Sequence, residues 1–427
     1  MIRILEYGKL SNQEIFARVI PQTNVADAVT NIIQAVRTEG DRALLAFTKE
    51  FDKAELDSLS VSQDEISEAF SAVEPAFLDV LENAANNIRA FHEKQVRNSF
   101  IMSSQNGALM GQKVTAIEKV GLYVPGGTAA YPSTVLMDAI PAKIAGCKQI
   151  VMVIPPGRDG KVNPAILAAA KIAGVTNIYK VGGAQAVAAL AYGTESIPKV
   201  DKIVGPGNAF VSEAKKQVFG QVSIDMIAGP SEILIVADGK SNAAHVAADM
   251  LSQAEHDKMA SAVLVTDDAA LAVAVQKELE AQIPLLPRAE IARASIDNHG
   301  KIIVAKDLSV AIDIANEIAP EHLELMVDDP FTYLDSIQHA GSIFMGRNCP
   351  EALGDYFAGP NHTLPTSGTA RFSSPLSVDD FVKKSQFTYY TDAALDAVAE
   401  QIARFARQEG LEAHARSAII RTEERGS

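Results

Sequence analysis

Short runs of β-branched and other apolar residues alternate with alanine-rich segments over most of the chain, and this pattern restricts the fold more than any other feature. Strands are predicted at 149–154, 177–181, 202–204, 232–237, 262–266, 301–304 and 323–327. Helices are predicted between them, at 133–145, 164–172, 184–191, 209–218, 243–253, 269–282 and 308–318. Apolar strands that are each followed by a helix are typical of parallel sheets covered on both faces. The sequence therefore predicts an α/β protein.

The chain has 427 residues, which is more than a single hydrophobic core usually holds. We therefore expect two α/β domains. Residues 1 to about 22 precede the first long helical stretch and are predicted to form a short arm, and 24 to about 100 are mostly helical. Residues 376–427 are predicted to be a polar, helical tail without a core of its own. Such a tail packs either on a partner subunit or on its own domain, and the pattern leaves both alternatives open.

Composition narrows the class of function. The formal net charge of -15 argues against a broad nucleic-acid surface, because phosphate binding depends on clustered lysine and arginine. No apolar run is long enough to cross a bilayer, and the first residues lack the features of a signal peptide. The two cysteines cannot form a disulfide framework and suit a reducing compartment. We expect a cytoplasmic enzyme that acts on a small molecule.

Three glycine-rich turns lie where a strand should lead into a helix, at 121–127, 181–185 and 205–210. Glycine lets main-chain N–H groups approach an anionic ligand at a helix N-terminus. The third turn resembles the dinucleotide fingerprint, but Phe210 stands where its last glycine should be, so the fingerprint is incomplete. Each turn carries a polar side chain that can address a nucleotide: Tyr123, Gln185 and Asn208. The alternative is that the glycines serve turn geometry alone.

Gln253 and His256 lie one helical turn apart, so both side chains leave the same face and can reach one ion. Imidazole suits zinc, whereas an amide oxygen is a less common ligand. A capped helix end with a solvated histidine is the simpler interpretation of this pair taken alone.

Adjacent Glu321 and His322 form a possible acid–base couple, because histidine titrates near neutrality and burial can raise a glutamate into the same range. They are predicted to lie between a helix and a strand, at the end of a parallel sheet where ligands do not usually bind. A surface Glu-His pair is the alternative. Other candidates are Asp355 in a loop-like segment and His414, with Glu409, in the tail. Cys349 has no base beside it in the sequence, so a nucleophilic role is disfavoured.

Eight segments together resemble the histidinol dehydrogenase family, in that family's order and spacing over almost the whole chain. They are GLYVPGG at 121–127, VGGAQA at 181–186, VGPGN at 204–208, DMIAGPSE at 225–232, QAEH at 253–256, APEHL at 319–323, LGDY at 353–356 and GPNHTLPT at 359–366. Phe210 departs only from the generic nucleotide fingerprint, which this family does not keep. The resemblance leaves none of the family's metal or catalytic positions substituted.

The resemblance implies oxidation of L-histidinol through L-histidinaldehyde to L-histidine, with two NAD reduced in succession. It implies one zinc ion per subunit, held by Gln253, His256, Asp355 and His414. The substrate contacts that it implies are these four ligands together with Ser231, His322 and Glu409, and the NAD contacts are Tyr123, Gln185 and Asn208. His414 and Glu409 are expected from the partner subunit of a homodimer, which would explain a tail without a core.

The implied domains are two Rossmann-like α/β domains. Residues 23–122 and 231–375 would form a metal and substrate domain, 123–230 an NAD-binding domain, and 376–427 the tail. In the implied chemistry His322 accepts the hydroxyl proton and Glu321 activates the water that adds to the aldehyde. A zinc hydrolase and a non-catalytic binding module for imidazole compounds are the alternatives. In a zinc hydrolase the glycine turns would be mere connections, and in a binding module Glu321 would be dispensable.

Overall fold

The computed structural model describes residues 1–18, 24–104, 107–126 and 130–426, so Gly127 and the end of the expected N-terminal arm lie outside the described residues. The chain divides into two compact units. Unit 1 comprises 1–95 and 117–381, and unit 2 comprises 96–116 and 382–427. No helix in the described ranges is long and apolar enough to cross a membrane.

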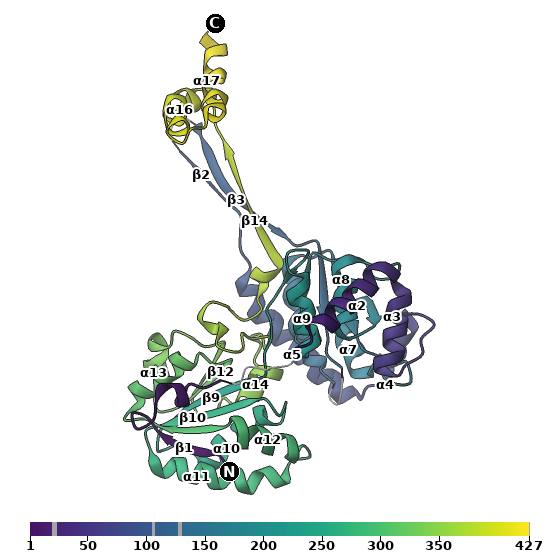
Figure 1. Ribbon diagram of the computed structural model, residues 1–427, viewed down its shortest axis with the longest axis vertical. Helices are drawn as coiled ribbons and strands as arrows, with labels where there is room; N and C mark the ends of the chain where they lie inside the picture. The colour runs from purple at the N-terminus through teal and green to yellow at the C-terminus, as the bar shows by residue number, and fades with distance from the viewer. Residues whose placement is uncertain (19–23, 105–106, 127–129, 427) are drawn as a thin grey trace. The chain divides into compact units, whose positions relative to one another are not determined.

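A six-stranded parallel sheet forms one half of unit 1, with the strand order β1-β11-β10-β9-β12-β13. Its strands are β1 (Arg3–Glu6), β9 (Glu232–Ala237), β10 (Ser261–Thr266), β11 (Lys301–Val304), β12 (His322–Met326) and β13 (Ser342–Met345). The helices α10 (Ala243–Ala254), α11 (Ala269–Gln282) and α12 (Ala289–His299) pack on one face. The other face is covered by α13 (Leu308–Ile318), seen across the sheet from α11 in Figure 1. Both faces are therefore buried, as continuous apolar strands require.

A five-stranded parallel sheet forms the other half of unit 1, with the order β6-β5-β4-β7-β8. Its strands are β4 (Lys119–Tyr123), β5 (Gln149–Ile154), β6 (Asn177–Lys180), β7 (Lys202–Val204) and β8 (Ser223–Ile224). One face is covered by α4 (Gln63–Ala72), α5 (Pro75–His92), α6 (Pro132–Ala145) and α7 (Pro164–Ala173). The other face is covered by α2 (Ala26–Glu39), α3 (Asp41–Phe47), α8 (Gly183–Tyr192) and α9 (Ala209–Val218).

These sheets confirm the α/β class and all seven predicted strands, but the N-terminal region differs from the expected division. The helices within 26–92 pack on the sheet of β4–β8, and not with 231–375 as expected. The reason is that α2 buries Val29, Ile33 and Val36 in the same core as the alanine-rich α8. The first residues are also more than an arm, because β1 pairs with β11 at the edge of the six-stranded sheet.

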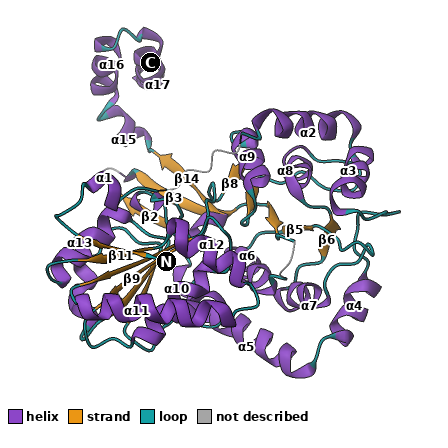
Figure 2. Cartoon of the chain, turned by 60° about the horizontal axis from the view of Figure 1, so that its bottom comes forward, coloured by secondary structure: helices purple, strands orange, loops and turns teal. Residues whose placement is uncertain are grey.

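Unit 2 is an antiparallel sheet followed by three helices. The strands β2 (Phe100–Ser103), β3 (Leu109–Ala116) and β14 (Val382–Tyr389) pair in the order β14-β3-β2. They are followed by α15 (Asp392–Asp396), α16 (Ala399–Gln408) and α17 (Glu412–Gly426), shown together in Figure 2. The sequence predicted a helical tail, and the strand β14 shows that this prediction holds only for part of it. The strand β14 is exposed along nearly all its length, so its side chains carry no apolar alternation that would identify a strand.

Lys301 provides a test of how the N-terminal segment is held. Its buried ammonium group donates to the carbonyls of Ile15 and Ala17, next to the short helix α1 (Asn12–Ile15). Lys301→Met removes both bonds and leaves the buried carbonyl of Ile15 without this partner, which costs about 1–3 kcal/mol. We expect the amides of α1 to exchange hydrogen faster in mass spectrometry. Lys306→Met, at an exposed position five residues on, should leave their exchange unchanged.

Candidate functional site

A cavity of about 1530 Å³ in unit 1 is lined by residues from both parallel sheets. It exceeds the roughly 300–1,000 Å³ of a typical small-molecule pocket, so it has room for two ligands at once. The candidates that line it are Tyr123, Gln185, Asn208, Ser231, Gln253, His256, Glu321, His322 and Asp355. Residues that lie far apart in the sequence therefore share one cavity.

The first group of candidates lies at the carboxyl ends of strands in the five-stranded sheet. Tyr123 ends β4, Gln185 lies in the first turn of α8 after β6, and Asn208 follows β7. The chain runs from β4 outward to β5 and β6 and then returns to β7 on the opposite side of β4. The loops after β4 and β7 thus flank the point where the strand order reverses, which is where open α/β sheets bind ligands.

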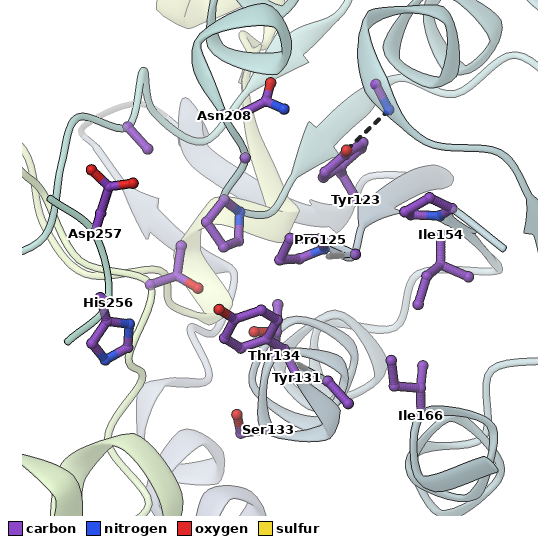
Figure 3. A pocket seen from close by; sticks show the side chains of 18 of the residues that line it. Tyr123, Pro125, Tyr131, Ser133, Thr134, Ile154, Ile166, Asn208, His256 and Asp257 are labelled. Atoms are coloured by element: carbon purple, nitrogen blue, oxygen red, sulfur yellow. Dashed lines mark hydrogen bonds between the residues drawn. The ribbon is translucent and has the colours of Figure 1, made fainter. Parts of the chain in front are cut away.

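Tyr123 and Asn208 are both fixed by hydrogen bonds to main-chain N–H groups. The Tyr123 hydroxyl accepts from Gly183 N at 3.0 Å, drawn as a dashed line in Figure 3. Burial raises the pKa of Tyr123 to about 12, so the phenol keeps its proton and can still donate it. The Asn208 Oδ1 atom caps α9 by accepting from Phe210 N at 3.0 Å and Val211 N at 3.2 Å. Its amide N–H groups are therefore the part of Asn208 that can address a ligand.

The second group lies at the amino ends of strands in the six-stranded sheet. Ser231 precedes β9, and His322 is the first residue of β12. Gln253 lies in the last turn of α10, and His256 continues that turn, since its N–H donates to the Gln253 carbonyl at 3.1 Å. The cavity therefore faces the carboxyl edge of one sheet and the amino edge of the other, and Figure 3 shows Asn208 and His256 lining it together.

His322 is fully buried and has a ring nitrogen without a partner. Its Nδ1 atom lies 3.0 Å from the Glu232 carbonyl and 3.0 Å from Nε2 of Gln253. A neutral ring can bond to only one of them: Nδ1–H donates to the carbonyl, whereas bare Nδ1 accepts from the amide. In the first tautomer Nε2, which has no partner among the described residues, keeps a lone pair. Burial lowers the pKa of His322, so at neutral pH the ring is uncharged and can accept a proton.

Glu321 is buried beside this ring. Its Oε2 atom accepts from Glu232 N at 2.8 Å and lies 3.6 Å from Nδ1 of His322. Burial, with the charges of Glu232, Asp355 and Glu351, raises the pKa of Glu321 well above its ordinary value. This is the direction expected for a carboxyl group that works as a base near neutral pH.

Three further titratable groups lie near His322, and the sequence assigned a role to Asp355 alone. Asp355 and Glu351 lie on the short helix α14 (Glu351–Tyr356), and their nearest oxygens are 4.0 and 3.8 Å from Nε2 of His322. His362 lies beyond them, with Nδ1 3.1 Å from the Asp355 carbonyl. Burial raises the pKa of Asp355 to about 6 and of Glu351 to about 7, and it lowers that of His362 to about 4. The GPNH segment carried the only sequence signal for His362, and nothing distinguished Glu351.

The donors here fit a bound metal ion. The Oε1 atom of Gln253 and the Oε1 atom of Glu351 are buried without hydrogen-bond partners within the described ranges. Ligand atoms of His322, Glu351 and Asp355 lie within 4.8 Å of one another. Unpaired buried oxygens are costly unless a ligand satisfies them. Imidazole, carboxylate and amide donors together suit zinc or a similar divalent ion.

The remaining two candidates lie in unit 2. Glu409 follows α16, and His414 lies in the first turns of α17. Both belong to the small helical layer whose core is formed by Ala403, Ala406 and Ala415.

Comparisons with known proteins agree with this arrangement. Residues 18–422 match the model of the histidinol dehydrogenase family. The chain belongs to this family. Histidinol dehydrogenases of Clostridium acetobutylicum and Syntrophotalea carbinolica are 53% and 56% identical, over 99% and 94% of this chain and 99% and 93% of theirs. A crystal structure of histidinol dehydrogenase from Elizabethkingia anophelis superposes with a TM-score of 0.96 at 39% identity, covering 100% of this chain and 99% of that one. The chain is therefore an enzyme of the oxidoreductase class.

Proposed function

We propose that this enzyme oxidises L-histidinol through L-histidinaldehyde to L-histidine, the last steps of histidine biosynthesis, and reduces two NAD in succession. The observation that carries the proposal is the shared cavity. An uncharged base and unpaired metal donors line one side of it, and the turns after β4 and β7 line the other. A dehydrogenase needs this juxtaposition, because the carbon that loses hydride must lie next to the nicotinamide.

One zinc ion per subunit would be held by Gln253, His256, Asp355 and His414, the last from the partner subunit. When bound, zinc would orient the substrate through its imidazole and amino nitrogens. The unpaired Oε1 atom of Gln253 supports its role as a ligand. Substrate contacts would come from Ser231, His322 and Glu409 in addition to the metal ligands.

Tyr123, Gln185 and Asn208 would bind NAD, which supplies the hydride acceptor when bound. The Tyr123 hydroxyl and the Asn208 amide each retain hydrogens to donate, because their oxygens are occupied by main-chain N–H groups. Phosphate oxygens and ribose hydroxyls accept such bonds.

The acid–base steps belong to His322 and Glu321. The uncharged His322 would accept the hydroxyl proton of histidinol at Nε2 while the carbinol carbon loses hydride. Glu321 would then take a proton from the water that adds to the aldehyde, and loss of a second hydride from the hydrate gives the carboxylate. Retention of the aldehyde in the cavity between the steps would prevent its escape.

The enzyme would be a cytoplasmic homodimer in which Glu409 and His414 complete the site of the other subunit. Unit 2 exposes large apolar side chains, including Ile101 at 68% and Phe405 at 70%. A small unit with so much exposed apolar surface is typical of a protein interface. This supports a partner subunit as the surface that covers the tail.

The first test follows absorbance of reduced nicotinamide with purified protein, histidinol and NAD. We expect two NADH per histidinol from the zinc-loaded protein. Removal of the metal by a chelator should abolish the reaction, and zinc should restore it, because the unpaired donors then hold their ion. No reduction by zinc-loaded protein would overturn the dehydrogenase proposal. Full activity of metal-depleted protein would show that the reaction does not require zinc.

Glu321→Gln separates the two half-reactions. The amide keeps the size of the side chain but cannot accept the water proton, so oxidation of histidinaldehyde should fall by about 10²–10⁴-fold. Oxidation of histidinol to the aldehyde should be much less affected. Glu317→Gln, at an exposed position four residues earlier, should change neither. Two unaltered half-reactions in Glu321→Gln would show that the base is assigned wrongly.

Mixed protomers test the shared site. His256→Ala and His414→Ala homodimers should each be inactive. A heterodimer contains one site with both histidines if each site draws on two chains, so random mixing should restore about a quarter of the activity. Absence of rescue, with heterodimers shown to form, would place His414 in the site of its own subunit.

A further inference from the structure

An ion pair between Lys215 and Asp225 lies in the interior of the five-stranded half of unit 1. Only 2% of the Lys215 side chain and 1% of the Asp225 side chain are exposed. Lysine is almost never buried to this extent. A buried pair contributes little to stability relative to apolar side chains of similar volume, because desolvation offsets the attraction. The pair therefore matters less for stability than for the main-chain groups that it holds in place.

The pair bonds to both main-chain groups of Gly205, the first residue after β7. Lys215 Nζ donates to the Gly205 carbonyl at 3.0 Å, and Asp225 Oδ2 accepts from Gly205 N at 2.7 Å. Gly205 has a φ of +115°, a backbone conformation that residues other than glycine rarely adopt. A Cβ atom on it would stand 2.1 Å from the Tyr123 carbonyl. The residue 205 main chain is thus held between the ion pair and the end of β4.

The same pair reaches both sides of the cavity. Gly205 opens the turn at 205–208 that ends in Asn208, and Lys215 lies on α9, which this asparagine caps. Asp225 opens the segment 225–231 that ends in Ser231, and its Oδ1 accepts from Met226 N at 2.6 Å. The Ser212 hydroxyl, also on α9, donates to the Ala228 carbonyl at 3.0 Å. The 205–208 turn and the 225–231 segment are therefore fixed to one another.

Asp138 on α6 adds a third connection. It is fully buried, its Oδ1 accepts from the Thr363 hydroxyl at 3.2 Å, and its Oδ2 has no partner within the described ranges. Burial and the charge of Asp225 raise the pKa of Asp138 well above the ordinary value, and Asp225 is the carboxylate that pairs with Lys215. Thr363 follows His362, so this bond connects α6 to the segment that carries His362.

We infer that Lys215 and Asp225 are positioning residues that hold the 205–208 turn for the dinucleotide and align it with the segment that carries Ser231. The inference rests on the proposed NAD site. The pair acts through the two hydrogen bonds to Gly205.

The test is the double variant Lys215→Met with Asp225→Asn, because either single change leaves an unpaired buried charge that destabilises the fold. A looser turn binds NAD more weakly in ground and transition state alike, so KM for NAD should rise by about 10-fold or more while kcat at saturating NAD is retained. KM for histidinol and the zinc content should stay as in the wild type. The control is Lys202→Met with Asp380→Asn, which removes another largely buried pair whose residues do not line the cavity. It should lower stability and leave KM for NAD unchanged.

An unchanged KM for NAD in the folded double variant would overturn the inference, and so would parallel changes in every kinetic constant of both double variants. Gly205→Ala gives a second measurement that leaves the ion pair intact. It forces the turn away from Tyr123 and should raise KM for NAD in the same way, and an unchanged value would contradict action through the turn. A wild type that reduces no NAD would overturn the proposed function itself, whereas an active wild type with unaffected variants overturns only the positioning role.

Discussion

Loss of hydration on burial shifts the pKa values of the titratable groups around His322. Glu321, Glu351 and Asp355 are buried around His322, and burial raises the pKa of each carboxyl group while it lowers that of the imidazole. Carboxyl groups whose pKa is higher in the folded than in the unfolded state reduce stability as pH rises through that interval, because folding then opposes ionisation. At neutral pH ionisation of these carboxyl groups therefore opposes folding, and the cation that we propose for this site would offset their repulsion.

The cavity lies between the carboxyl edge of one parallel sheet and the amino edge of the other, and each edge supplies a different set of groups. At the carboxyl edge of the five-stranded sheet, main-chain N–H groups and glycine turns leave room for a large anionic ligand. At the amino edge of the six-stranded sheet, a helix end and the start of β12 supply imidazole, amide and carboxylate groups. Neither edge contains all the groups that the proposed reaction needs, so that reaction would depend on the alignment of the two edges.

The sequence predicted the strands that are buried on both faces, because a continuous apolar run bounded by turns is a strong local signal. In unit 1 it missed β1, β8 and β13, which lie at the edges of their sheets, and β4, where Gly121 interrupts the apolar pattern. Residue patterns alone left the metal and acid–base candidates open, and the family resemblance selected among them. Glu351 was missed because its importance depends on a tertiary contact: α14 brings it within 3.8 Å of His322 Nε2. No spacing in the sequence encodes that approach.

The need to align the two edges also accounts for the buried ion pair between Lys215 and Asp225. An apolar pair in place of Lys215 and Asp225 would fill the same space without the cost of desolvation. It would not bond to the main chain of Gly205, whose conformation no local preference enforces once the turn leaves β7. Apolar contacts are non-directional, whereas two hydrogen bonds of opposite sense fix both the position and the orientation of a peptide. A buried ion pair is thus a reasonable solution where the placement of one turn matters more than the stability gained from it.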